Sequence, residues 1–210
     1  MNEIFQPPPR STETKAGERG GMDQATLEAV LPRARAGDAA AFAEIYRAFS
    51  RRVFGLCRHL LGSAEAAEDA TSEVFLRAQR AMNTYNSALP FPRWLLSIAG
   101  NYCIDQLRRR RLEARLFVPE EADLAEPAGR GPSPLAGVLT EEKQRAVRTA
   151  IEALPERYRA PLLLRYYADM SYEEIGASLR LPRSQVATLI FRAKKELRRK
   201  LAPAEKELRA

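Results

Sequence analysis

The chain has 210 residues, of which 45% are hydrophobic, and it carries a formal net charge of +7. This length holds one or two domains, and the apolar content is high enough for a packed core, so the chain as a whole is not disordered. It contains no run of about 18 apolar residues, which excludes a membrane-spanning helix.

The residue types on which most enzymes and metal sites depend are scarce. The single histidine, His59, follows Cys57 with one residue between them, which is not a metal-ligand spacing. We expect Cys57 and Cys103 to be reduced thiols on apolar helical faces. The sequence therefore predicts no metal, no cofactor and no catalytic residue, and hence not an enzyme.

Charge is distributed unevenly along the chain. Residues 1–22, with three consecutive prolines, are predicted to be a disordered tail, and they lack the layout of a secretory signal, so we expect a cytoplasmic protein. Residues 23–112 hold 13 bases and 9 acids, and residues 141–210 hold 16 bases and 10 acids. The segment between them is acidic. A polyanionic partner is expected to contact both basic parts and to avoid the acidic one.

The first basic part is predicted to be helical from Asp38, which can cap a helix. The sequence LGS at 61–63 ends that helix, and its serine can cap the next. Residues 83–92 have the composition of a loop, and Pro92 suits the first turn of a third helix. That helix ends in the four arginines at 108–111.

Residues 113–139 are acidic and rich in Pro, Gly and Ala, and they are predicted to be a flexible linker. A further helix is expected from Thr140, followed by a helical stretch that Pro161 either kinks or begins. No stretch alternates as a strand does. The predicted fold class is all-α, with two small helical domains at 23–112 and 140–210.

The second domain has the layout of a helix-turn-helix. Ser171 and Glu174 form a capping box for a short helix, and Pro182 can begin the next one. One face of that next helix is apolar. The opposite face carries Ser184, Thr188, Arg192, Lys195 and Arg199. Small polar residues at its start can reach base edges while the cations meet phosphates. The competing interpretation is a solvated basic helix that only completes a small core.

Two clusters in the first domain allow two interpretations each. Trp94 and the arginines at 108–111 suit single-stranded nucleic acid, because bases stack on aromatic rings while cations hold the backbone. Otherwise Trp94 belongs to the core and Asp105 neutralises part of the charge. The stripe of Glu65, Glu68, Asp69 and Glu73 suits a basic protein partner, or it reflects acids favoured near a helix N-terminus.

Taken together, these features resemble the sigma-70 superfamily of RNA polymerase sigma factors, in its compact extracytoplasmic-function group. The segment AEDATSEVFLRAQR (67–80) is similar to the family's docking segment for the polymerase core. The segment FPRWLLSIAGNYCIDQLRRRR (91–111) is similar to its −10-reading and melting segment. Residues 154–201 are similar to its −35-reading domain.

The resemblance implies roles for matching positions. Core docking would fall to Glu68, Asp69, Glu73, Phe75 and Leu76. The separated −10 strand would contact Tyr85, Asn86, Arg93, Trp94, Asn101, Arg108 and Arg109, with residues 85–89 receiving a flipped-out base. The −35 duplex would contact Arg183, Ser184, Gln185, Thr188, Arg192 and Lys195. It also implies an anti-sigma partner and a chain that is monomeric when free of polymerase.

The sequence departs from the family pattern at two places. Ser72 stands where the family often has Gln, which by the resemblance weakens one polar contact to the polymerase core. Residues 184–189 read Ser-Gln-Val-Ala-Thr-Leu where Gly-Thr-Val-Lys-Ser-Arg is usual, so two cations are missing. Each lost phosphate contact lowers the salt dependence of DNA binding by about one unit of slope.

The main rival is a conventional helix-turn-helix regulator, which would bind a palindrome as a dimer. Two weaker rivals are a nucleic-acid-processing enzyme and an adaptor that binds only an anti-sigma protein. The predicted function is a dissociable initiation factor that binds core polymerase, reads −35 and −10 elements and melts the −10 region.

Overall fold

The computed structural model describes residues 22–117 and 146–207. Within these two ranges every regular element is a helix, and the predicted all-α class is confirmed. None of the described helices is both long and apolar enough to cross a membrane.

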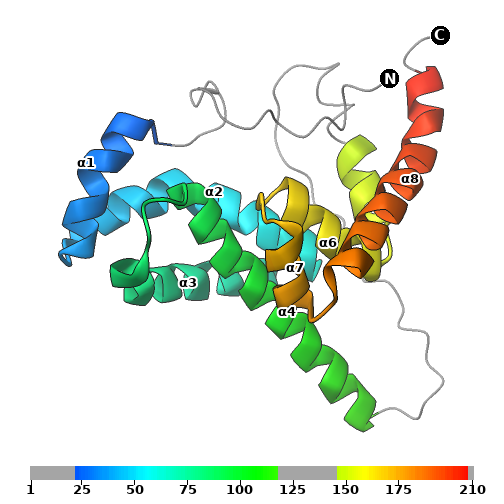
Figure 1. Cartoon of the computed structure of the whole chain (residues 1–210), viewed down its shortest axis with the longest axis horizontal. Coiled ribbons are helices and arrows are strands. Elements are labelled where there is room, and N and C mark those ends of the chain that lie inside the picture. Colours follow the sequence, from blue (N-terminus) through cyan, green and yellow to red (C-terminus); the bar gives the residue numbers. More distant parts are fainter. Residues whose placement is uncertain (1–21, 118–145, 208–210) are drawn as a thin grey trace.

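The first domain is built around one central helix. Its helices are α1 (Gln24–Arg35), α2 (Ala39–Leu61), α3 (Ala64–Ala81) and α4 (Phe91–Phe117) (Figure 1). Helix α2 contacts the other three, and α3 and α4 also pack against each other. This arrangement leaves one side of α3 and one side of α4 outside the bundle.

Local capping explains where these helices begin and end. The side chains of Asp38 and Ser63 accept hydrogen bonds from backbone N–H groups in the first turns of α2 and α3. Gly62 follows α2 in the left-handed conformation, with φ at 77°, which glycine adopts without steric cost. The caps predicted from the sequence are confirmed.

Two stretches differ from the expected elements. Helix α1, capped by Asp23 and with Pro32 in its interior, lies before Asp38, which was the first predicted helix start. At the other end of the domain α4 continues past position 112, so residues 113–117 are helical. The remainder of the expected linker and residues 1–21 of the expected tail lie outside the described residues.

The second domain contains a short helical segment at 146–152, then α6 (Glu156–Tyr166), α7 (Tyr172–Leu179) and α8 (Arg183–Glu207). The expected helix start at Thr140 lies outside the described residues. Helix α8 packs against both α6 and α7.

The turn between α7 and α8 follows the predicted helix-turn-helix geometry. Ser171 and Glu174 form both hydrogen bonds of a capping box. Arg180 ends α7 in the left-handed conformation, with φ at 56°. A Cβ atom at Gly176 would lie 2.7 Å from the backbone oxygen of Leu181, so the close approach of the corner to α7 requires glycine there.

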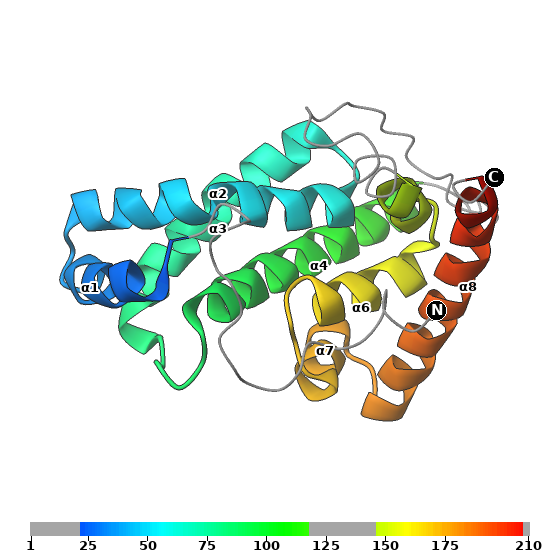
Figure 2. The same ribbon diagram turned by 90° about the horizontal axis from the view of Figure 1, so that it is seen from above.

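The two domains share a hydrophobic core, which the sequence did not predict. Helix α6 lies against α2 and α4, and α7 lies against α4 (Figures 1 and 2). The larger core runs continuously from α1 across this junction to Val186 and Ile190 of α8. A smaller cluster around Leu154, Leu162 and Leu197 holds the outer half of α8.

Candidate functional site

The acidic stripe of the first domain lies on the outer side of α3. Glu68 and Asp69 are exposed and form no ion pair with another described residue, while Glu73 accepts a hydrogen bond from Arg77 at 2.7 Å. Leu76 is 48% exposed. The side chains of this face therefore combine free carboxylates with one apolar group.

Phe75 does not belong to that surface. Its side chain is 3% exposed and packs against the rings of Phe42 and Tyr46, with centroids 6.3 and 4.6 Å away. The expectation that Phe75 docks directly on a partner does not fit this position, because helical periodicity alone does not distinguish the edge of a buried face from its centre. Phe75 can only support the surface from beneath.

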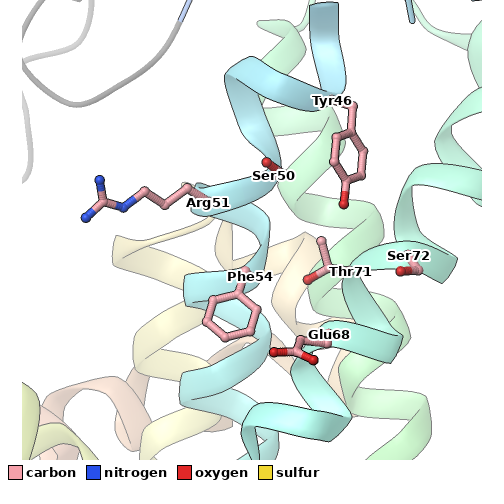
Figure 3. A pocket seen from close by; sticks show the side chains of 7 residues that line it. All are labelled: Tyr46, Ser50, Arg51, Phe54, Glu68, Thr71 and Ser72. Atoms are coloured by element: carbon pink, nitrogen blue, oxygen red, sulfur yellow. The ribbon is translucent and has the colours of Figure 1, made fainter. Parts of the chain in front are cut away.

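A shallow groove lies beside the acidic face, between α2 and α3 (Figure 3). Helix α3 contributes Glu68, Thr71 and Ser72 to its lining. Helix α2 contributes Tyr46, Ser50, Arg51 and Phe54. Ser72, where the sequence departs from the family pattern, therefore lies in the lining of this groove.

The loop before α4 is held by an aromatic cluster. The ring of Tyr85 lies 5.4 Å from that of Phe91 and 5.1 Å from that of Trp94, and its hydroxyl donates to the carbonyl of Leu89 at 2.7 Å. Arg35 of α1 donates to the backbone oxygen of Tyr85 at 2.8 Å. Tyr85 is buried and Trp94 half-buried, so in this form neither ring is free to stack on a base. The structure thus favours the core interpretation of Trp94.

The polar residues of α4 are already engaged by α7. Arg93 donates to the Glu174 carboxylate at 2.8 Å. Asn101 contacts the hydroxyl of Ser178, and Arg108 donates to the carbonyl oxygen of Ser178. The sequence did not point to Glu174 or Ser178 here, because their contacts join positions at least 70 residues apart.

The charge of this cluster is balanced within the fold. Burial opposes ionisation of Glu174, but hydrogen bonds from Ser171 and from the Arg93 guanidinium hold the pKa of that carboxyl below its ordinary value. Arg108 also pairs with Asp105 at 3.2 Å, as the spacing predicted. Arg109 is exposed, and so is Asn86 in the preceding loop, whose amide oxygen accepts from the Ala88 N–H at 2.9 Å.

Helix α8 presents the predicted polar face to solvent. All six expected −35 residues are exposed: Arg183, Ser184, Gln185, Thr188, Arg192 and Lys195. Val186, Ile190, Ala193 and Leu197 are buried, which confirms the predicted core face.

Two polar groups on α8 have partners within the domain. Arg183 donates to Glu173 at 2.5 Å, and the Thr188 hydroxyl donates to the Ser184 carbonyl at 3.0 Å. Phe191, absent from the predicted set, is 69% exposed and lies three residues after Thr188, on the same side of the helix. The only sequence signal that could have placed Phe191 on the DNA-facing side was its helical spacing from Thr188.

Comparison with known proteins identifies the class to which this fold and these surfaces belong. Residues 45–113 match the family model "Sigma-70 region 2", and residues 144–197 match "Sigma-70, region 4". The chain is 30% identical to the ECF RNA polymerase sigma factor SigW of Bacillus subtilis (strain 168), over 81% of this chain and 94% of that protein. It is 31% identical to the ECF RNA polymerase sigma-E factor of Escherichia coli (strain K12), over 86% of this chain and 97% of that one.

A solved structure has the same fold. It is that of CnrH in complex with the cytosolic domain of CnrY, with a TM-score of 0.52 and 20% identity over 85% of this chain and 98% of that chain. The family and sequence matches show a non-enzymatic promoter-specificity factor. The chain belongs to the extracytoplasmic-function group of the sigma-70 family, as its sequence predicted.

Proposed function

We propose that this chain binds core RNA polymerase in the cytoplasm and directs it to promoters with −35 and −10 elements. The observation that carries the proposal is that three helices present surfaces of different chemical character. An acidic and apolar face on α3, a polar and cationic face on α4 and an exposed cationic face on α8 occur in the order that the family pattern requires.

The face of α3 would be the polymerase contact. Glu68 and Asp69 are free to pair with a basic surface, which electrostatic attraction would orient during association. Leu76 supplies apolar area, and Glu73 would have to exchange its pair with Arg77 or keep it at the rim. The groove next to Ser72 would receive a projecting side chain of the partner.

The face of α4 and the loop before it would hold the separated −10 strand. Arg93, Arg108 and Arg109 would contact phosphates, and Asn101 would contact a base. A base flipped out of the stack would enter the loop at 85–89, which costs a few kcal/mol that contacts in the loop must offset. The Tyr85 hydroxyl would have to release Leu89 for that to happen.

The exposed face of α8 would lie in the major groove of the −35 element. Gln185 and Thr188, near its N-terminal end, would reach base edges, and Arg192 and Lys195 would contact phosphates. Phe191 would place an apolar ring against the same groove, as thymine methyl groups accept. The missing cations at positions 187 and 189 reduce the electrostatic share of this binding.

Regulation would come from a second protein, an anti-sigma factor that binds the free, monomeric chain. CnrH, which has the same fold, is seen in complex with the cytosolic domain of CnrY, and this supports a protein partner for the chain.

The test is promoter-specific transcription in vitro. Core polymerase with this chain should produce defined run-off transcripts from promoters mapped by holoenzyme binding. Substituting Asp69→Arg should lower core affinity at least about tenfold, because a like charge then meets the basic surface. Glu28→Arg on α1 makes the same change of charge away from that face and should bind core as the parent does. Unchanged core affinity for Asp69→Arg would show that the docking assignment is wrong.

A further inference from the structure

The loop proposed to receive a flipped-out base is anchored through three groups of one residue, Tyr85. Its ring packs against those of Phe91 and Trp94, with centroids 5.4 and 5.1 Å away, and its hydroxyl donates to the carbonyl of Leu89 at 2.7 Å. Its own backbone oxygen accepts a hydrogen bond from Arg35 at 2.8 Å. The ring and hydroxyl contacts are local in the chain, whereas Arg35 belongs to α1 and lies 50 residues earlier.

The guanidinium group of Arg35 is directed at this loop. Besides the hydrogen bond to the backbone oxygen of Tyr85, it lies over the ring of the same residue, 5.9 Å from the centroid. The other cation near the end of α1 has different partners, because Arg33 pairs with Asp38 at 2.7 Å and lies 3.6 Å from Glu44. Arg33 therefore holds the corner between α1 and α2, and Arg35 holds the loop before α4.

We propose that Arg35 is a positioning residue for −10 recognition, which fixes the start of the base-binding loop while the base enters on the side of Leu89. The inference rests on the proposed function of residues 85–89. It adds that α1, which precedes the residues 45–113 that match region 2, takes part in selecting the base. A charged donor binds a carbonyl more strongly than a neutral one does, so the backbone of Tyr85 stays anchored when its hydroxyl releases Leu89.

Base selection requires hydrogen-bonding groups at fixed positions, because a flipped base is recognised by hydrogen bonds to its Watson–Crick edge. In this loop the N–H groups of Ala88 and Leu89 donate to the side-chain and backbone oxygens of Asn86, at 2.9 and 3.1 Å. These bonds keep their geometry while the start of the loop is fixed by Arg35. A loop that is free to adapt accepts the wrong base more readily, whereas phosphate contacts from the arginines of α4 carry no base information. Loss of Arg35 should therefore reduce base selectivity more than total strand binding.

The position of α1 allows this role to be tested separately from the other surfaces. Helix α1 lies at the end of the molecule remote from α6, α7 and α8 (Figures 1 and 2). It packs against α2 and against the short 3₁₀-helix η2 (Met82–Thr84), which leads into the loop. Leu27, Val30 and Ala34 are its buried residues, and Arg35 is exposed. Removal of the Arg35 guanidinium should therefore leave α1 in place and affect the loop alone.

The test compares Arg35→Met, which keeps an unbranched side chain and removes the charge and the donors, with Arg33→Met on the same helix. In the free full chain, amide hydrogen exchange at Tyr85, Ala88 and Leu89 should be about tenfold faster in Arg35→Met, the effect of losing one charged hydrogen bond. Run-off transcription by holoenzyme from promoters carrying each base at each −10 position measures selectivity. The ratio between the best and the worst base should fall about tenfold at one position in Arg35→Met, with −35 selectivity unchanged. Arg35→Lys keeps the charge and should recover part of both losses.

Arg33→Met should match the parent in exchange and in selectivity, and losses as large as those of Arg35→Met would overturn the inference, because they would come from a general weakening of α1. Parent-like exchange in Arg35→Met would also overturn it. So would faster exchange with unchanged −10 selectivity, because the order of the loop would then not select the base. A parent that transcribes selectively leaves the proposed function standing whatever the Arg35 variants do. A parent that does not transcribe from the mapped promoters removes that function and this inference with it.

Discussion

His59 lies where the two domains meet, and its protonation is tied to their contact. Burial, reinforced by the positive charges of Arg148, Arg58 and Arg159, lowers the pKa of His59 to about 4. The carboxylate of Glu152 is 3.9 Å from Nδ1, beyond hydrogen-bond distance, so its opposing effect is the weaker one. His59 is therefore neutral at physiological pH when the two domains are in contact.

This shift predicts a specific loss of stability in mild acid. In the unfolded chain His59 binds a proton near its ordinary pKa of 6.5. In the folded chain its pKa is about 4, so it stays neutral until the pH is much lower. The contribution of neutral His59 to the free energy of unfolding is thus fully present above pH 6.5, and it falls as the pH drops toward 4. Between pH 7.5 and 5.0 the free energy of unfolding, measured with urea, should fall about 2 kcal/mol more in the parent than in His59→Gln.

The variant isolates His59 because every carboxylate titrates in both proteins. Tyr167, whose ring centroid lies 6.3 Å from that of His59, has its pKa raised by burial and stays neutral throughout this range. If the free energy of unfolding changes with pH in the same way in parent and variant, protonated His59 must become solvated or find a hydrogen-bond partner in the folded chain.

Residue-scale predictions from the sequence succeeded where the chemistry is local. Asp38 and Ser63 cap their helices because a side-chain oxygen has only to reach N–H groups two or three residues away. The placement of Phe75 and Tyr85 could not be predicted in the same way. Burial of an aromatic ring depends on neighbours from other helices, which the spacing of a single segment does not specify.

At the scale of the element, α8 was the most predictable part of the molecule. Its alternation of buried and exposed positions follows from the helical period once the start at Arg183 is known, and that start follows from the capping box and corner before it. Its DNA preference is not predictable in this way, because the usual cations are absent at 187 and 189.

That absence leads to a prediction for Gln185. The substitution Gln185→Ala should change the preferred −35 sequence at one position by about 1 to 3 kcal/mol of discrimination, because a bidentate contact to a base edge is lost. Holoenzyme transcription from a library of −35 variants would measure this. Lys200→Ala, at an exposed cation outside the predicted reading face, should weaken all variants alike. Equal use of every −35 variant by Gln185→Ala and the parent would contradict the assignment.

At the scale of the whole molecule, the continuous core couples the two domains. Ala160, Leu163 and Leu164 of α6 share one buried cluster with residues of α1 to α4. No local sequence signal predicts this shared core. The acidic segment between the two basic parts has the composition of a spacer whether or not the domains pack against each other. The contact depends on complementary surfaces from segments that lie far apart in the chain.

A shared core predicts cooperative unfolding of the parent. Calorimetry of the full chain should show a single transition whose calorimetric and van't Hoff enthalpies agree. A Cβ atom on Gly100 of α4 would lie 2.5 Å from Cδ2 of the buried Leu164 in α6, and one on Gly55 of α2 would overlap the hydroxyl of Tyr167. Gly55→Ala/Gly100→Ala should therefore weaken the contact between the domains and split the transition into two. The first-domain transition should lie at the higher temperature, because alanine stabilises α2 and α4 by up to about 1 kcal/mol per site. Two transitions already present in the parent would indicate that the domains are thermodynamically independent.

The pairing of Arg93 with Glu174 also constrains how these sequences can diverge. An ordinary ion pair can reverse its signs over evolutionary time, with each replacement compensating the other. Here Arg93 would also face a nucleic-acid strand whose charge never changes sign, so only the partner on α7 is free to drift. Lineages should then lose Glu174 while retaining Arg93. The α4–α7 contact is thus an ion pair in which only the acidic side can change without loss of the nucleic-acid contact.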